Sequence, residues 1–271
     1  MMEWRNIIRG AVMGISDLIP GVSGGTMALA LGIYKQLLEA INGIFSRNWK
    51  QHFAFLIPLG IGILAAVFTL SGLMEWLLEH HPKPTFFFFL GLILGIIPLL
   101  LRKIEYRKSF RASHYLLVAI AAVLVALTAF AREDGLDSVI QNFTAGDYIF
   151  LFFAGWLASS AMILPGISGS FVLLLLGAYP TVIGALSDRN LLVIGVVGCG
   201  VVIGILVMSR LIHFLLAHYT VGTYAVIIGM VVGSIVVVFP GFTSQIGTLL
   251  ICLVMLVVGY GASLLIGRFD R

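Results

Sequence analysis

Charged residues are scarce in this chain of 271 residues. Asp, Glu, Lys and Arg together make up 10% of it, whereas soluble domains carry roughly 25%. Hydrophobic residues reach 60% and the mean hydropathy is +1.10, which excludes a soluble globular protein. Apolar runs such as 53–78 and 246–266 are as long as the roughly 20 residues that a membrane-spanning helix needs. We therefore expect a polytopic integral membrane protein.

Cysteine is nearly absent, since Cys199 and Cys252 are the only two. They lie in separate apolar runs without the spacing of metal ligands, so we interpret both as small residues in the helix packing. No motif for a metal or a cofactor occurs, and we expect neither. The net charge of +4 comes from basic residues in loops, so it indicates membrane topology rather than nucleic-acid binding.

One stretch of the sequence occurs twice, and each copy interrupts an apolar run. The first motif is Pro20-Gly21-Val22-Ser23-Gly24-Gly25-Thr26, and the second motif is Pro165-Gly166-Ile167-Ser168-Gly169-Ser170-Phe171. The same offset of 145 residues relates Leu31-Gly32-Ile33-Tyr34 to Leu176-Gly177-Ala178-Tyr179. Interrupted apolar segments at corresponding points of two halves indicate the substrate site of a transporter.

The rest of each half also repeats, at an offset of 138 residues. The aligned pairs are Gly62 with Gly200, Ser71 with Ser209, His80 with His218, Thr85 with Thr223, Gly91 with Gly229 and Gly95 with Gly233. We predict repeat 1 over residues 1–135 and repeat 2 over residues 146–271. Repeat 1 comprises a hairpin at 4–42 and helices at 53–78, 85–101 and 114–131; repeat 2 comprises a hairpin at 148–187 and helices at 191–217, 223–240 and 246–266.

Both hairpins are expected to be re-entrant, with arms at 4–20 and 26–41 and at 148–164 and 170–186. The segment from Ile7 to Ile19 would form only about 20 Å of helix, whereas the hydrocarbon core is roughly 30 Å thick. With this arrangement twelve of the 16 Lys and Arg residues lie on the side of both termini, which the positive-inside rule assigns to the cytoplasm. Each repeat then has three crossings, so the two are inverted and the hairpin tips meet near the membrane midplane.

Each motif combines features of an anion site. Glycines permit positive φ and close approach of a ligand, and the helix that follows presents unpaired N–H groups and a positive dipole end. The candidate phosphate ligands are Ser23, Gly24, Gly25 and Thr26 in the first motif and Ser168, Gly169 and Ser170 in the second. The alternative is that Pro-Gly-x-Ser-Gly only kinks two helices for packing.

Three charged residues fall inside apolar segments. Arg210 is the first choice for a further phosphate ligand, because a guanidinium offers a planar set of donors; alternatively its side chain reaches the cytoplasmic surface. Asp17 and Glu75 are candidates for carrying a coupling proton, or they are structural. Glycines 195, 198, 200 and 204 are expected to be close-packing positions between helices.

The two motifs, read with Asp17-Leu18-Ile19 and Leu164 before them, resemble those of the bacterial polyprenyl-phosphate translocase family. The likeness extends over essentially the whole chain. It implies a non-enzymatic transporter that carries undecaprenyl phosphate, the lipid carrier of cell-wall precursors, back across the cytoplasmic membrane. Its partners would be the polyprenyl-phosphate lipid and the bilayer, with a homo-oligomer left open.

Two other functions are compatible with these motifs. An ion-coupled carrier of small soluble anions would use the same donors. Undecaprenyl-diphosphate phosphatases have a similar motif, Pro-Gly-x-Ser-Arg-Ser, but here Gly24 and Gly169 stand in place of its arginine and no paired-glutamate motif accompanies the first hairpin. Hydrolysis requires charge stabilisation at the phosphate, so the enzyme is disfavoured.

Overall fold

The computed structural model describes residues 3–18, 23–130, 140, 143–241 and 245–266. All regular elements in these ranges are helices, which confirms the predicted all-α class. Six of them are long and apolar enough to cross a membrane, as expected for a multi-pass membrane protein. The helices are α1 (Arg5–Asp17), α2 (Gly24–Ala30), α3 (Tyr34–Asn42), α4 (Trp49–His80), α5 (Pro82–Lys103), α6 (Tyr106–Ser109), α7 (Ala112–Thr128), α8 (Ala145–Ile163), α9 (Gly169–Leu175), α10 (Tyr179–Ser187), α11 (Leu191–His218), α12 (Thr220–Val238) and α13 (Ile246–Ile266).

Five of the six predicted crossings coincide with the long apolar helices α4, α5, α11, α12 and α13. The remaining prediction, 114–131, corresponds to α7, which has only 17 residues. The last residue of the predicted segment, 131, lies outside the described ranges. The sixth helix of spanning length is α8, which the sequence analysis assigned to a hairpin arm beginning at 148. It begins three residues earlier because the Thr144 backbone N–H donates to the Asp147 carboxylate at 2.7 Å, which caps the first turn.

The second arm of each hairpin is two short helices rather than the continuous segments predicted at 26–41 and 170–186. The breaks lie at Gly32 and Gly177, whose φ values are 69° and 68°. Each glycine ends a helix in the left-handed conformation, and the amide of the next residue bonds back to the carbonyl five residues before it, at 3.0 Å and 2.9 Å. As a result α9 and α10 are bent by 115°.

Glycines allow α1 to lie directly on α4, and α8 on α11. A Cβ at any of four positions would overlap a backbone carbonyl of the facing helix. The contacts pair Gly10 with Leu59 and Gly62 with Ile7 in the first half, and Gly155 with Val197 and Gly200 with Phe152 in the second. Each second-half residue lies 145 or 138 positions after its counterpart, so the same contacts occur twice. The expected packing role holds for glycines 200 and 204, whereas a Cβ at 195 or 198 would meet nothing within 4 Å, so these two positions face open space.

The helices α7 and α13 each pack on the other half of the chain. A Cβ at Gly91 of α5 would overlap the Leu256 carbonyl of α13, and one at Gly229 of α12 would overlap the Val118 carbonyl of α7. These two contacts are again related by 138 positions. The two halves are therefore interlocked through an exchange of helices.

The largest apolar core surrounds α2 and α3, which pack with α5 and α12. All seven residues of α2 are buried. Fully buried side chains of this core include Met27, Ile33, Leu38, Ile96 and Val231. The first hairpin is thus at the centre of the molecule.

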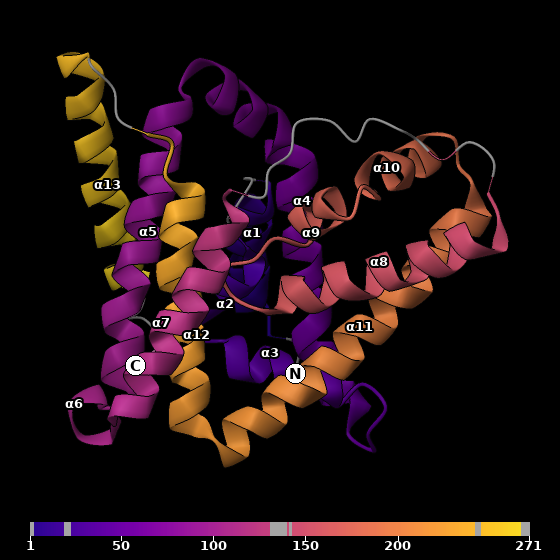
Figure 1. Cartoon of the computed structure of the whole chain (residues 1–271), viewed down its shortest axis with the longest axis horizontal. Helices are drawn as coiled ribbons and strands as arrows, with labels where there is room; N and C mark the ends of the chain where they lie inside the picture. Colours follow the sequence, from indigo (N-terminus) through magenta and orange to yellow (C-terminus); the bar gives the residue numbers. More distant parts are fainter. Residues whose placement is uncertain (1–2, 19–22, 131–139, 141–142, 242–244, 267–271) are drawn as a thin grey trace.

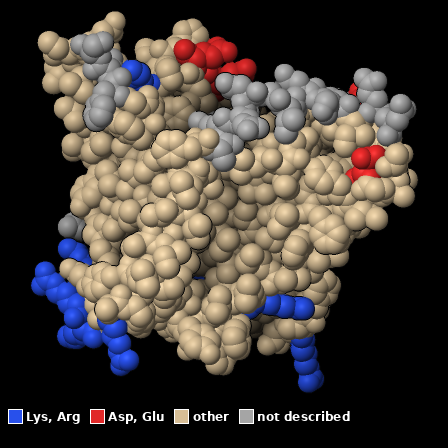
Figure 2. Space-filling view, viewed as in Figure 1, with Lys and Arg blue, Asp and Glu red and all other residues tan. Residues whose placement is uncertain are grey.

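Corresponding turns of the two halves lie at opposite edges of the molecule. In Figure 1 the α4–α5 turn is at the top, whereas the α11–α12 turn and α6 are at the bottom. Figure 2 shows Lys and Arg gathered mainly at the lower edge, and Asp and Glu at the upper edge. On this face the visible basic and acidic residues therefore lie mainly at different edges.

The close contact at Gly200 predicts a position-specific effect of a single methyl group. Gly200→Ala should destabilise the protein by about 1–3 kcal/mol, because α8 and α11 would have to separate. Gly198→Ala on the same helix should be neutral or slightly stabilising, because that position faces open space. Thermal unfolding of both variants in detergent measures the difference, and equal midpoints would contradict the proposed contact.

Candidate functional site

The first motif is described from Ser23 onward, while Pro20, Gly21 and Val22 lie outside the described residues. Ser23 is the N-cap of α2, and its Oγ accepts a hydrogen bond from the Thr26 N–H at 3.3 Å. The two hydroxyl oxygens also lie 3.3 Å apart. Both side chains are 1% exposed, so this motif is closed to bulk solvent.

A carboxylate occupies the start of α2. The Gly24 N–H donates to the Asp17 Oδ1 at 2.6 Å, which joins the end of α1 to the beginning of α2. A Cβ at Gly24 would lie 2.8 Å from the Asp17 Oδ2, so any other residue here would displace the carboxylate. Asp17 therefore fills the position that an anionic ligand would otherwise take at this helix start.

The second motif has the same backbone plan and different side-chain contacts. Gly166 has a φ of 86°, and Ser168 is the N-cap of α9. The hydroxyl oxygens of Ser168 and Ser170 lie 2.8 Å apart. The residue that corresponds to Asp17 is Met162, so the second motif has no carboxylate at that position. The Met162 side chain is 46% exposed.

The structure brings the two motifs into contact. The Gly166 N–H donates to the Thr26 Oγ1 at 2.9 Å in a buried position. The Tyr34 hydroxyl donates to the Ile163 carbonyl at 3.1 Å, and a Cβ at Gly25 would lie 3.0 Å from the same oxygen. Residues about 140 positions apart thus form one junction of hydroxyls and backbone amides.

Exposure differs between the two copies. No residue of α9 is buried, in contrast to α2. A cavity of about 220 Å³ lies beside the first motif, and Asp17, Gly24, Gly25, Tyr34 and Ser159 interrupt its mainly apolar wall. Ser168 and Gly169 are partly exposed and Ser170 is exposed. The second motif therefore offers donors to a ligand without a change in the surrounding packing.

The other predicted ligands do not join this junction. Arg210 is exposed on α11, beside Ser209, whose hydroxyl donates to the Asn42 Oδ1 at 2.9 Å. It therefore lies next to the end of α3. Glu75 is exposed near the end of α4 that leads into α5. Of the charged candidates, only Asp17 contacts a motif residue.

Two polar residues that link helices escaped the sequence analysis, Tyr34 at the junction and Asn42 at the end of α3. Tyr34 belongs to the repeated Leu-Gly-x-Tyr stretch, which marks the repeat without indicating a hydrogen bond to the Ile163 carbonyl. Asn42 links α3 to α11 through Ser209, also donating from its amide to the Ser209 carbonyl at 3.2 Å. Ser209 aligns with Ser71, but Ser71 is exposed, so the alignment alone carries no sign of this contact.

The polar groups at the junction are neutral donors. Hydroxyl and amide N–H groups from two segments converge, and hydrogen bonds to a charged acceptor are stronger than those between neutral groups. Among the described residues, no group of three His, Cys, Asp or Glu side chains is arranged to hold a metal ion. The hydroxyl and amide N–H groups at this junction can form hydrogen bonds.

The junction predicts a specific role for the Thr26 hydroxyl. Thr26→Val should destabilise the protein by about 1–3 kcal/mol, because the buried Gly166 N–H would lose its acceptor. Thr26→Ser retains the hydroxyl and should stay within about 1 kcal/mol of the parent protein. Thermal unfolding of the two variants distinguishes them; equal loss in both would contradict a specific role for the hydroxyl.

Comparison with known proteins places the chain in a family. A family model described as undecaprenyl phosphate translocase-like matches residues 13–249. The polyprenyl-phosphate transporter of Staphylococcus aureus is 45% identical over 273 residues, covering 98% of this chain and 96% of that protein. The polyprenyl-phosphate transporter of Vibrio cholerae is 38% identical over 246 residues, covering 86% and 76%.

No solved structure matches the chain. The family and both relatives carry the names of transporters, in agreement with the expectation of a transporter rather than an enzyme. The match covers both motifs and the helices that position them. The chain belongs to the undecaprenyl phosphate translocase-like family.

Proposed function

We propose that this protein moves undecaprenyl phosphate across the bacterial cytoplasmic membrane and so returns the lipid carrier for reuse. The names of the two relatives support the substrate class. The observation that carries the mechanism is the hydrogen bond from the Gly166 N–H to the Thr26 hydroxyl, which joins the two interrupted segments. A head group held there would be reached from each side of the membrane in turn.

An inverted repeat is part of this proposal. The same glycine contacts occur in both halves, and corresponding turns lie at opposite edges in Figure 1. Under the positive-inside rule the edge rich in Lys and Arg in Figure 2 faces the cytoplasm. Both termini are then cytoplasmic, the first hairpin dips in from that side, and the second dips in from outside.

Crossing is costly for this lipid because its phosphate must leave water. A charged group in hydrocarbon is penalised by several kcal/mol unless protein groups replace its hydration. We assign that replacement to Ser23, Gly24, Gly25 and Thr26 in the first motif and to Ser168, Gly169 and Ser170 in the second. The isoprenoid chain would stay in the lipid through a lateral opening. Rocking of one repeat against the other would then expose the head group to each side alternately.

Arg210 has a different place in this scheme. Its exposed position beside the end of α3 favours contact with the phosphate on the cytoplasmic part of the route rather than at the junction. A guanidinium there would attract the head group and orient it with paired donors. Arg210→Ala is accordingly expected to weaken capture of the lipid while leaving the junction intact.

Proton coupling is assigned to Asp17, with Glu75 as the second candidate. An ionised Asp17 accepts the Gly24 N–H, whereas a protonated carboxyl is a much weaker acceptor and would release that N–H to a phosphate. Binding of the proton and of the anion would thereby favour each other. Glu75 contacts neither motif, which favours Asp17 of the two.

Asp17→Asn should therefore make transport independent of a pH gradient. We expect affinity for the lipid to lose its dependence on pH, because the neutral amide of asparagine, like a protonated carboxyl, is a weaker acceptor for the Gly24 N–H than the carboxylate. Transport into proteoliposomes with and without a pH gradient measures this. Glu75→Gln is run beside it, and Glu79→Gln serves as an exposed control on the same helix. Retention of the gradient effect in Asp17→Asn, with its loss in Glu75→Gln, would transfer the role to Glu75.

The substrate is tested by native mass spectrometry of the purified protein. Undecaprenyl phosphate, undecaprenyl diphosphate and inorganic phosphate compete in one mixture. We expect preferential retention of the monophosphate lipid without hydrolysis, weakened about tenfold or more in Ser23→Ala/Ser168→Ala, because charge-assisted hydrogen bonds are lost. Indifference to the lipid chain would favour a carrier of small soluble anions, and cleavage of the diphosphate would indicate an enzyme.

A further inference from the structure

A groove of about 780 Å³ runs between the start of α7 and the turn that joins α11 to α12. Its volume is within the range of roughly 300–1,000 Å³ that ligand sites occupy in proteins. It lies at the edge of the molecule that also carries α6, the lower edge in Figure 1. We call it the access groove.

The mouth of the access groove is basic. Arg111, His114 and His218 line it, and none of the described residues in its wall is acidic. Farther in, the wall becomes apolar, with Leu117, Leu215, Val226, Ile227 and Met230. The groove is therefore amphipathic along its length, which matches a molecule with an anionic end and a hydrocarbon chain.

The inner end of the groove reaches the second motif. Tyr34 and Leu164 are part of its wall, and Leu164 directly precedes Pro165 and Gly166. The Met230 carbonyl lies 2.6 Å from the position that a Cβ on Gly166 would take. A chain of contacts therefore connects the basic mouth to the junction of the two motifs.

Both histidines at the mouth are held by backbone groups. The Arg111 N–H donates to the His114 Nδ1 at 2.9 Å, so the neutral ring of His114 carries its proton on Nε2. The His218 Nδ1 lies 3.0 Å from the Phe214 carbonyl, which can only accept, so this nitrogen donates. The His218 ring also stacks on Phe214, with ring centroids 4.3 Å apart. Both rings are thus fixed in place before any ligand arrives.

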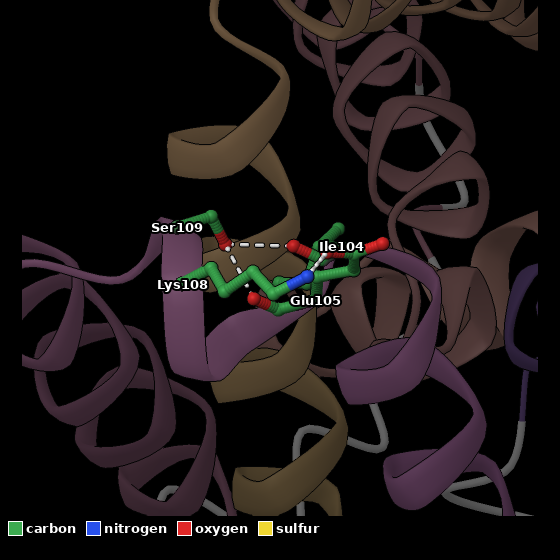
Figure 3. A network of polar contacts seen from close by, with 4 residues as sticks. All are labelled: Ile104, Glu105, Lys108 and Ser109. Carbon is green, nitrogen blue, oxygen red and sulfur yellow. Dashed lines mark hydrogen bonds and ion pairs between the residues drawn. The ribbon is translucent and has the colours of Figure 1, made fainter.

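The acidic residue nearest in sequence to the mouth is already paired. Figure 3 shows the turn from α5 into α6, where the Lys108 ammonium lies 2.8 Å from a Glu105 carboxylate oxygen. The Ser109 hydroxyl donates to the Ile104 carbonyl at 2.7 Å, which closes the turn. Arg111 follows two residues later. A second cavity of about 760 Å³ shares Ser109 with the groove and adds Lys35, Lys103 and Lys108.

We propose that the access groove is the path by which the lipid phosphate leaves the protein for the cytoplasmic leaflet. Arg111 and the Nε2–H of His114 bind the phosphate at the mouth, where an imidazolium at His218 would also donate from Nε2, and the first isoprenoid units lie along Leu117, Leu215 and Val226. The phosphate reaches the mouth from the second motif along the groove. This inference rests on the proposed function and adds the place at which the substrate leaves the protein.

The chemistry of the wall favours a polyprenyl monophosphate over a soluble anion. A soluble anion would gain nothing from the apolar inner wall. The exposed apolar residues of α7 beside the mouth, such as Leu116 at 61% exposure, face the surface that lipid would cover. An isoprenoid chain therefore has a continuous apolar path from the bilayer into the groove.

The test separates capture of the phosphate from capture of the chain. Binding of undecaprenyl phosphate and of uncharged undecaprenol to the purified protein is measured by native mass spectrometry. Arg111→Gln/His218→Gln should lower affinity for the phosphate about tenfold, since charge-assisted hydrogen bonds are lost, and leave polyprenol binding unchanged. Leu117→Trp should lower the affinity for both. The matched controls are Arg47→Gln, an exposed arginine in the α3–α4 turn, and Leu124→Trp, an exposed leucine on α7 that does not line the groove.

Binding of undecaprenyl phosphate by the parent protein distinguishes failure of the access groove from failure of the proposed function. Strong retention of the phosphate by the parent protein, with groove variants equal to their controls, would overturn the access groove and leave the proposed function standing. Failure of the parent protein to retain the phosphate would overturn both. Thermal unfolding verifies that each variant is folded, and if Leu117→Trp is not, the loss of phosphate preference in Arg111→Gln/His218→Gln decides the question alone.

Discussion

Inside hydrocarbon a polypeptide must pair its own backbone donors and acceptors, and this chain has breaks in its helices between α1 and α2 and between α8 and α9. Side chains replace the missing helical bonds. The Thr26 hydroxyl accepts the Gly166 N–H, the Asp17 carboxylate accepts the Gly24 N–H, and the Ile163 carbonyl receives the Tyr34 hydroxyl. Each interrupted segment is completed partly by the other. The position of the hairpins, and the packing of the long helices around them, depends on these few bonds.

The scaffold is repeated, but the polar contacts at its centre are not. Glycine-to-carbonyl contacts recur at the same offsets in both halves, because they depend only on backbone shape. The side chains at the motifs differ: Met162 corresponds to Asp17, and Phe171 corresponds to Thr26. One copy is consequently closed and internally bonded, while the other is open at Ser168 and Ser170. A symmetric frame with unequal centres suits a cycle in which one side of the site is shut while the other is open.

Much of this architecture could be predicted from the sequence, and the misses have physical causes. Long apolar runs predict the long helices, because length and hydropathy are local properties. The break at Gly32 was not predictable in the same way, since a glycine inside an apolar run also fits close helix packing. The direction in which the Arg210 side chain points depends on the rotation of α11 about its axis. The contact between Ser209 and Asn42 helps to set that rotation. The Asp17 bond to Gly24 depends on how the chain turns between α1 and α2, and no periodic pattern encodes that turn.

The exchange of helices between the halves has a consequence for biogenesis. The face of α5 that carries Gly91 packs closely on α13, which is synthesised after all the other described helices. Until α13 is made, that face, which allows close backbone approach, is covered by lipid or by other proteins of the insertion machinery. Neither half can complete its own packing, so the chain reaches its native arrangement only after α13 has been synthesised. Truncation that removes α13 would therefore expose a surface in the other half of the chain, and quality control could recognise it there.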